Sequence, residues 1–201
     1  FIMKFFITGG SGLLGQRIAT VADNNDEVIL AHNSNCMDNS VKCDITDKSQ
    51  VADVIGGSDC DVIIHAAAMT NVDLCEDEVD MAYDINANAT GYIAQTAEDI
   101  GAKVIYVSTD FVFDGEVGNY TEDDSVNPLG IYAKSKYEGD VMLQKYSSNW
   151  AIARVSVLYG WHERNNFTTW LIDELRNHNS VNIVTDQINS PTYADNAAEA
   201  M

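Results

Sequence analysis

A glycine-rich segment near the N-terminus constrains the fold of this chain more than any other feature. Gly9, Gly12 and Gly15 follow an apolar run, Met3–Thr8, and lead into an apolar periodic segment, Leu13–Ala22. Glycines at this spacing let the backbone turn sharply from a strand into a helix. The first N–H groups of such a helix lack partners, and its positive end attracts phosphate. The pattern therefore predicts a pyrophosphate site for a nucleotide cofactor; the alternative is a merely tight strand–helix turn.

Beyond the glycines, short apolar runs alternate with segments of helical periodicity. We expect strands at Met3–Thr8, Glu27–Ala31, Ser40–Cys43, Asp61–Ala66, Lys103–Ser108, Trp150–Val155 and Val181–Val184. We expect helices at Leu13–Ala22, Asp47–Ile55, Glu76–Ile100, Ile131–Tyr146, Phe167–Asn177 and Tyr193–Met201. Such alternation predicts an α/β fold of the Rossmann type, a doubly wound parallel sheet of about seven strands with helices on both faces.

Composition excludes several classes of function. The 201 residues carry 31 acidic and 11 basic side chains, a net charge of −20, which a nucleic-acid backbone would repel. Because no apolar run is long enough to span a bilayer and no leader precedes the glycine loop, we expect a cytoplasmic protein without a membrane segment. The four cysteines form no C-x-x-C pair and the four histidines lack ligand spacing, so we expect free thiols and no metal site.

A second group of residues points to acid–base chemistry. Tyr132 and Lys136 are four residues apart in a helical segment, so both project from one face. A phenol titrates near pH 10, and a neighbouring ammonium can lower that pKa; a shift of three units requires about 4 kcal/mol. Ser108-Thr109-Asp110 closes a strand predicted in mid-sheet, where a hydroxyl could bond a substrate carbonyl beside the phenol. The alternatives are a surface Tyr–Lys contact and a turn or helix-capping hydroxyl.

The end of the second strand bears on the choice of cofactor. In an NAD site a carboxylate at this position binds the ribose 2′-hydroxyl, but Ala31–Ser34 contains no carboxylate. Asp26 and Glu27 lie at the wrong end of the strand. Neutral polar groups, with Arg17 of the first helix, could instead accept a 2′-phosphate. The sequence therefore favours NADP(H) over NAD(H), and both stay open.

In combination these motifs resemble the extended short-chain dehydrogenases/reductases, and within them the dTDP-4-dehydrorhamnose reductase family. The resemblance runs from Thr8 to Met201. The matching segments are T-G-G-S-G-L-L-G (8–15), C-D-I (43–45), H-A-A-A-M-T-N-V-D (65–73), Glu76, Asn86, S-T-D-F-V-F-D-G (108–115), Tyr132 with Lys136, R-V-S-V-L-Y-G (154–160) and D-Q-I-N-S-P-T (186–192). The segments 108–115 and 186–192 narrow the match to the reductase branch.

The resemblance implies roles for individual residues. Thr109, Tyr132 and Lys136 would be catalytic: the first orients the keto oxygen, the second donates the proton, and the third holds the nicotinamide ribose and lowers the phenol's pKa. The implied cofactor-binding residues are Gly9, Gly12, Leu13, Leu14, Gly15, His32, Asn33, Asp44, Ile45, Ala66, Ala67, Ala68, Tyr132, Lys136 and Val157. The implied substrate-binding residues are Thr70, Asp110, Phe111, Val112 and Arg154, and Asn86 would support the site's geometry.

The implied activity is NADPH-dependent reduction of the C4 keto group of a nucleotide-linked 4-keto-6-deoxy sugar, dTDP-4-dehydrorhamnose to dTDP-L-rhamnose, by a homodimer. Residues 3–160 would form the cofactor domain with the catalytic residues, and 161–201 the start of a substrate-binding part that continues further. Two alternatives stay open. One is a non-catalytic NADP-binding subunit like the β subunit of methionine adenosyltransferase, and the other is another nucleotide-sugar epimerase or reductase of the extended family. Trp161–Arg164 departs from the plainer glycine-rich turn of many relatives.

Overall fold

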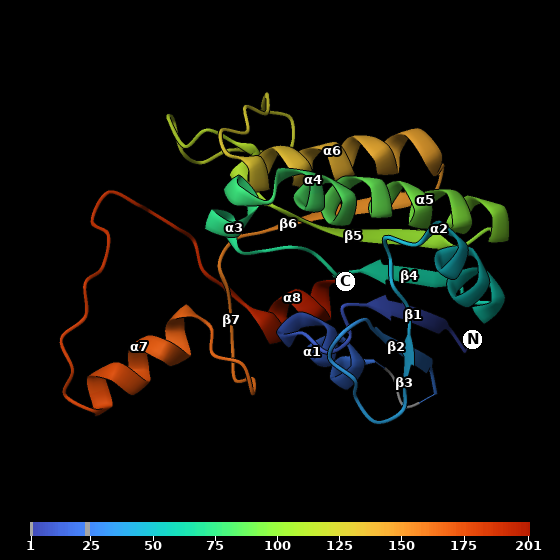
Figure 1. Ribbon diagram of the computed structural model, residues 1–201, viewed down its shortest axis with the longest axis horizontal. Coiled ribbons are helices and arrows are strands. Elements are labelled where there is room, and N and C mark those ends of the chain that lie inside the picture. Colours follow the sequence, from blue (N-terminus) through green and yellow to red (C-terminus); the bar gives the residue numbers. More distant parts are fainter. Residues whose placement is uncertain (1, 23–24) are drawn as a thin grey trace.

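A parallel sheet of six strands forms the centre of the molecule (Figure 1). The computed structural model describes residues 2–22 and 25–201. The strands are β1 (Lys4–Thr8), β2 (Glu27–His32), β3 (Ser40–Lys42), β4 (Val62–His65), β5 (Lys103–Thr109) and β6 (Trp150–Val155), in the order β3-β2-β1-β4-β5-β6. This order reverses beside β1, which confirms the doubly wound α/β architecture expected from the sequence.

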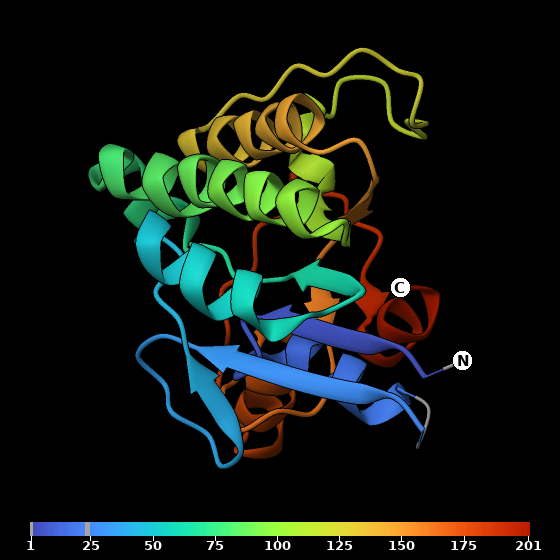
Figure 2. The same cartoon turned by 90° about the vertical axis from the view of Figure 1, so that its right-hand side faces the viewer.

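Helices cover both faces of the sheet. The helical segments are α1 (Leu13–Val21), α2 (Lys48–Gln50), η1 (Val51–Ile55), η2 (Gly56–Ser58), α3 (Val72–Asp77), α4 (Val79–Tyr83), η3 (Asp84–Asn88), α5 (Ala89–Ile100), η4 (Asp110–Val112), α6 (Ile131–Tyr146), α7 (Phe167–Arg176) and α8 (Ala194–Ala200). Figures 1 and 2 show α5 and α6 on one face, with α1 and α8 on the other.

Adjacent residues of each central strand supply the two cores. Phe6, Ile63 and Val104 are buried against the α5 side, whereas their neighbours Ile7, Ile64 and Ile105 are buried against the α1 and α8 side. Successive side chains of a strand point to opposite faces, so a sheet covered on both faces needs continuous apolar runs. This explains why the central strands read as unbroken apolar segments in the sequence.

The seventh expected strand is absent from the described residues. Val181–Val184 forms no strand and pairs with no strand of the described residues, and Val184 is 65% exposed. Its apolar residues match a strand pattern, but a strand also requires a hydrogen-bonded neighbour, and the described six-stranded sheet ends at β3 and β6. A separate two-stranded sheet, β7 (Leu158–Tyr159) with β8 (Thr192–Tyr193), forms instead.

The helix expected at Glu76–Ile100 starts earlier and is interrupted. Asn71 caps α3 by accepting a hydrogen bond from the Leu74 N–H. Glu78 then leaves helical geometry, with φ −116° and ψ 60°, and separates α3 from α4. A π-helical turn, η3, follows before α5. Such turns are frequent at functional sites, and this one carries Asn86 toward the interior.

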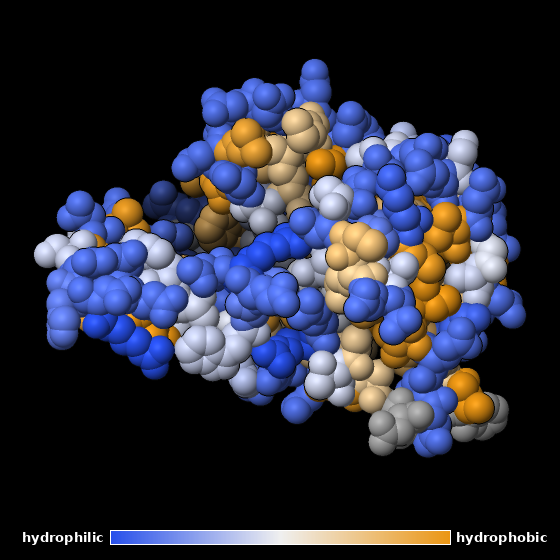
Figure 3. Space-filling model, turned by 60° about the horizontal axis from the view of Figure 1, so that its bottom comes forward, coloured by the Kyte–Doolittle hydropathy of each residue, from blue (hydrophilic) through white to orange (hydrophobic). Residues whose placement is uncertain are grey.

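Hydrophilic residues cover most of the face shown in Figure 3, as the large net charge requires. Within the part of the chain that the structure describes, no helix combines the length and the apolar character needed to cross a bilayer.

Candidate active site

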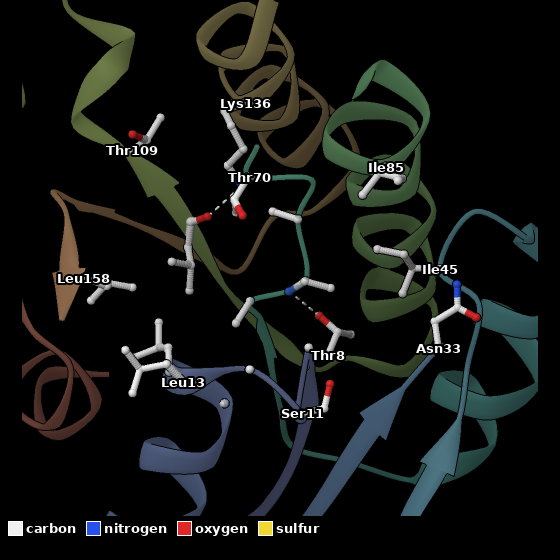
Figure 4. Close-up of a pocket in the computed structure, with 18 of the residues that line it drawn as sticks. Thr8, Ser11, Leu13, Asn33, Ile45, Thr70, Ile85, Thr109, Lys136 and Leu158 are labelled. Atoms are coloured by element: carbon white, nitrogen blue, oxygen red, sulfur yellow. Dashed lines mark hydrogen bonds between the residues drawn. The ribbon is translucent and has the colours of Figure 1, made fainter. Parts of the chain in front are cut away.

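A cavity of about 1090 Å³ opens at the carboxyl ends of the central strands (Figure 4). Ends of parallel strands beside a reversal of strand order are where doubly wound folds bind ligands. Ser11 and Asn33 lie at one end of the cavity, and Thr109 and Lys136 lie at the other. Its volume is at the upper limit of about 1,000 Å³ for ordinary ligand pockets, so it has room for an extended ligand.

The glycine loop approaches its neighbours so closely that side chains are excluded at two of its positions. Gly9 has φ +69°, and a Cβ atom there would lie 2.8 Å from the Ala67 nitrogen. A Cβ atom on Gly15 would lie 2.5 Å from the Gly9 carbonyl oxygen, so the helix can approach the loop only without a side chain. Gly12 is the N-cap of α1 and offers no side-chain cap. The first N–H groups of α1 are therefore free to bind a pyrophosphate, and the loop fits a dinucleotide.

Buried hydrogen bonds hold the opposite wall, Ala66–Ala68, in place. The Thr8 hydroxyl lies 2.7 Å from His65 Nδ1 and accepts a hydrogen bond of 3.2 Å from the Ala67 N–H. The other ring nitrogen of His65 lies 3.1 Å from the Thr90 hydroxyl. Burial, and secondarily the charge of Lys136, lowers the pKa of His65 to about 3, so this histidine stays neutral. We did not anticipate this network, although Thr8 and His65 both end central strands.

Thr109 and Tyr132 meet at the end of β5. The Thr109 hydroxyl accepts a hydrogen bond of 3.2 Å from the Phe111 N–H and so caps η4, which was the alternative reading of this residue. The Tyr132 ring packs edge-on against Phe111 at 6.0 Å. Burial raises the pKa of Tyr132, hydrogen bonding with Thr109 lowers it, and the charge of Asp110 raises it. Thr109 therefore serves as a cap and as a neighbour of the phenol.

Lys136, one helical turn after Tyr132 in α6, is buried. Its Nζ donates a hydrogen bond of 2.8 Å to the Val107 carbonyl and lies 4.0 Å from the centre of the Tyr106 ring. Burial lowers the pKa of Lys136 to about 7, and the charge of Asp140 opposes that shift. The expected lowering of the phenol's pKa by this lysine stays a prediction.

The structure brings nearly all the predicted site residues to the wall of one cavity. Those that line it are Gly9, Gly12, Leu13, Leu14, Gly15, His32, Asn33, Asp44, Ile45, Ala66, Ala67, Ala68, Thr70, Thr109, Asp110, Phe111, Tyr132, Lys136 and Val157. Val157 has φ +36°, a left-handed conformation that a β-branched residue rarely adopts and that is frequent at functional sites.

Two predicted substrate-binding residues do not reach the cavity wall as the described residues form it. Val112 is completely buried behind it. Arg154 points toward α6, where its Nη2 lies 3.2 Å from Asp140 Oδ2 and its guanidinium lies 5.4 Å from the centre of the Phe113 ring. Asp140 is 99% buried, and a buried carboxylate requires a charged partner. The Arg154 guanidinium therefore pairs with Asp140 and does not face the cavity.

Arg17, expected near a 2′-phosphate, also lies elsewhere. Its Nε forms an ion pair of 3.0 Å with Asp195, and its Nη2 donates to the Trp161 carbonyl at 2.6 Å. Cavity residues to which the sequence assigned no role include Ser11, Asn35, Thr46, Asn165 and Arg164. Arg164 lies in the Trp161–Arg164 segment that departs from the family pattern, and that departure was the one available signal. The described residues contain no group of three metal-ligating side chains.

Comparison with known proteins places this geometry in a family. The model of the family described as RmlD substrate binding domain matches residues 3–201. The chain belongs to this family. Among curated relatives of this RmlD-family chain, a dTDP-4-dehydrorhamnose reductase from Aggregatibacter actinomycetemcomitans is 38% identical over 98% of the chain and 66% of that protein. A methionine adenosyltransferase 2 subunit beta from Bos taurus is 33% identical over 97% of the chain and 60% of that protein.

A solved structure agrees with the family assignment. The dTDP-4-dehydrorhamnose reductase of Bacillus anthracis, crystallised in complex with NADP, superimposes with a TM-score of 0.91 at 33% identity. It covers 100% of this RmlD-family chain and 69% of the crystallised chain. The chain thus spans about two thirds of the length of its reductase relatives.

Proposed function

We propose that this protein reduces the C4 keto group of a nucleotide-linked 4-keto-6-deoxy sugar with a nicotinamide dinucleotide, dTDP-4-dehydrorhamnose to dTDP-L-rhamnose. One observation carries the proposal: a single cavity contains both an open glycine loop and the Thr109–Tyr132–Lys136 group, at opposite ends. A dinucleotide seated on the loop would bring its nicotinamide toward that group. The names of the reductase relatives support the same substrate class.

Each residue has a defined part in this proposal. The glycine loop and the start of α1 hold the pyrophosphate, with Asp44 and Ile45 at the adenine end. The bound cofactor supplies the hydride. Thr109 donates a hydrogen bond to the keto oxygen and orients it toward Tyr132. The phenol O–H of Tyr132 donates a proton to the same oxygen as negative charge develops on it, which general acid catalysis requires.

Burial keeps the Tyr132 phenol protonated until a positive charge is brought near. A phenol whose pKa is raised stays protonated at neutral pH, and it becomes a stronger acid only when a positive charge is brought near. Lys136, whose pKa is about 7 and which lies one helical turn further along α6, would supply that charge. In the proposed reaction its ammonium turns from the Val107 carbonyl toward the nicotinamide ribose and Tyr132.

We propose NADP(H) as the preferred cofactor. The cavity wall at the end of β2 consists of Ala31, His32, Asn33, Ser34 and Asn35, with no carboxylate to bind a ribose 2′-hydroxyl and repel a 2′-phosphate. The Bacillus anthracis relative was crystallised with NADP, which agrees with this preference.

The domain bounds, the cellular location and the oligomeric state are also proposals. Residues 3–160 would form the cofactor domain, and residues 161–201 would begin the substrate-binding part. We propose that the protein is a homodimer in the cytoplasm. The analogy with the family supports the dimer, and gel filtration with light scattering would test it.

Turnover and product identity test the proposed function. The full-length gene product would be mixed with dTDP-4-dehydrorhamnose and NADPH, and loss of absorbance at the nicotinamide band would be followed while nuclear magnetic resonance identifies the sugar. We expect stoichiometric oxidation of NADPH and formation of a 4-hydroxy sugar.

Other results would support the alternatives. Tight NADPH binding without oxidation would favour a regulatory subunit like the bovine relative. Inversion of a sugar hydroxyl without net use of NADPH would favour an epimerase.

A further inference from the structure

The cavity end that would face a ribose 2′-phosphate needs a cation that β2 does not supply. Arg17 is committed to Asp195 and to the Trp161 carbonyl, so it does not face this end. His32 lies here, but its Nδ1 is 2.7 Å from the Ser40 hydroxyl. A phosphate monoester is best held by a guanidinium, which offers several charged donors in one plane.

Arg164 places a guanidinium next to the glycine loop. Its Nη2 lies 3.4 Å from the Ser11 hydroxyl oxygen, inside the glycine loop, and both residues line the cavity. The loop in turn runs against the end of β2, because the Gly10 N–H donates a hydrogen bond of 2.9 Å to the Ala31 carbonyl. Figure 4 shows Ser11 and Asn33 at this same end, away from Thr109 and Lys136. Arg164 therefore contacts the part of the glycine loop that is hydrogen-bonded to the end of β2, although it is more than 120 residues away in sequence.

Two hydrogen bonds within residues 160–166 shape the segment that carries Arg164. The Arg164 N–H donates to His162 Nδ1 at 3.0 Å, and the Asn166 side-chain amide donates to the Gly160 carbonyl at 2.6 Å. Gly160 lies so close to α1 that a Cβ atom would be 3.3 Å from Leu13 Cδ1. These contacts hold the turn against the glycine loop and keep the guanidinium near Ser11.

We propose that Arg164, together with Ser11, forms the subsite for the ribose 2′-phosphate and thereby determines the preference for NADP(H). The inference rests on the proposed dinucleotide site. Electrostatics makes a cation at this subsite necessary, because five carboxylates line the cavity and the net charge of the chain is −20. A phosphate with nearly two negative charges needs a local cation in such a field.

Equilibrium binding tests the proposal without turnover. Dissociation constants for NADPH, NADH and 2′,5′-ADP would be measured by calorimetry for the full-length wild-type protein and for Arg164→Gln, Arg164→Lys and Arg176→Gln. Arg176 ends α7 outside the cavity wall and is the charge-matched control. For Arg164→Gln we expect at least about tenfold weaker binding of NADPH and of 2′,5′-ADP, as for loss of one charged hydrogen-bond partner, with NADH unchanged within about twofold. Arg164→Lys should recover part of the loss, and Arg176→Gln should bind like the wild type.

The outcomes separate the subsite from the wider function. Equal weakening of NADPH and NADH would overturn the proposal and assign Arg164 to the pyrophosphate instead. Unchanged binding of both by Arg164→Gln would also overturn it, and either result leaves the dinucleotide site intact. A wild-type protein that binds none of the three ligands would overturn the proposed function itself.

Discussion

The carboxylate of Asp140 and the guanidinium of Arg154 form an ion pair of 3.2 Å beneath the candidate active site. Asp140 follows Lys136 by one turn of α6, and Arg154 pairs in register with Ser108 of β5. Burial raises the pKa of Asp140, and the charges of Arg154 and Lys136 lower it again. The pair therefore joins the sheet to the helix that carries both Tyr132 and Lys136.

Removing one member of this pair should destabilise the protein. Asp140→Asn leaves the Arg154 charge mostly buried and uncompensated, and we expect a loss of about 3 kcal/mol in the free energy of unfolding. Urea denaturation monitored by circular dichroism would measure it. Glu138→Gln, which removes a carboxylate from the same helix, should change stability by less than about 0.5 kcal/mol. The double variant Asp140→Asn/Arg154→Met should be more stable than Asp140→Asn alone; equal or lower stability would contradict the pairing.

The glycine loop predicts a sharp contrast between two alanine substitutions. Gly15→Ala places a Cβ atom 2.5 Å from the Gly9 carbonyl oxygen, so the loop must move and dinucleotide binding should weaken at least about tenfold. Gly57→Ala is the control, since a Cβ atom there meets nothing within 4 Å. Fluorescence titration with NADPH measures both. Wild-type affinity in Gly15→Ala would mean that the close approach of α1 is not required.

Acid should destabilise the protein through His65. Its folded-state pKa of about 3 lies below the usual 6.5, so between these values the unfolded chain binds a proton that the folded chain does not. The contribution of His65 is thus complete above pH 6.5 and decreases as the pH falls, by up to about 1.4 kcal/mol per pH unit. Urea unfolding between pH 7 and 4.5 would show this slope, at pH values above the range in which most carboxylates titrate. His65→Gln should flatten it, and an unchanged slope in that variant would assign it to other groups.

Asn86 should contribute to stability through the wall of the site. Its side chain accepts a hydrogen bond of 2.9 Å from the Met69 N–H and donates to the Met69 carbonyl at 3.1 Å and to the Ser135 hydroxyl at 3.0 Å. Asn86→Ala removes the acceptor of the buried Met69 N–H and one partner each of the Met69 carbonyl and the Ser135 hydroxyl, which keep their contacts with Cys75 Sγ and the Tyr132 carbonyl, at a cost of about 2–4 kcal/mol in unfolding free energy. Asn88→Ala, which removes an exposed hydrogen bond to Asp84, is the matched control with little effect. Thermal unfolding compares them, and similar melting temperatures would contradict this supporting role.

Much of this architecture could be read from local sequence. The unbroken apolar strands, the Gly9–Gly12–Gly15 spacing and the four-residue interval from Tyr132 to Lys136 each reflect geometry within one element or one turn. Such features predicted the parallel sheet, the glycine loop and the Tyr132–Lys136 pair, whereas the other residues of the cavity wall were implied by the family resemblance. Parallel strands then bring their carboxyl ends together, which is why residues from separate motifs share one site.

What the sequence did not reveal depends on long-range pairing. Arg17 and Arg154 resemble free cations in the sequence, but Asp195 and Asp140 engage them in the folded chain. Val181–Val184 has a strand's composition, yet pairing depends on a neighbouring edge that local pattern does not encode. Arg164 reaches Ser11 only because the segment after β7 turns back over α1.

The most direct test of the central claim is the effect of Tyr132→Phe on the reduction of dTDP-4-dehydrorhamnose by the full-length protein. Tyr137→Phe, on the same helix but outside the cavity wall, is the control. Losing the proton donor should lower kcat at least about 100-fold, while the dissociation constant for NADPH stays within about twofold of the wild-type value. A Tyr132→Phe protein that keeps kcat within about threefold of the wild type, at full NADPH affinity, would contradict the assignment of Tyr132 as the acid.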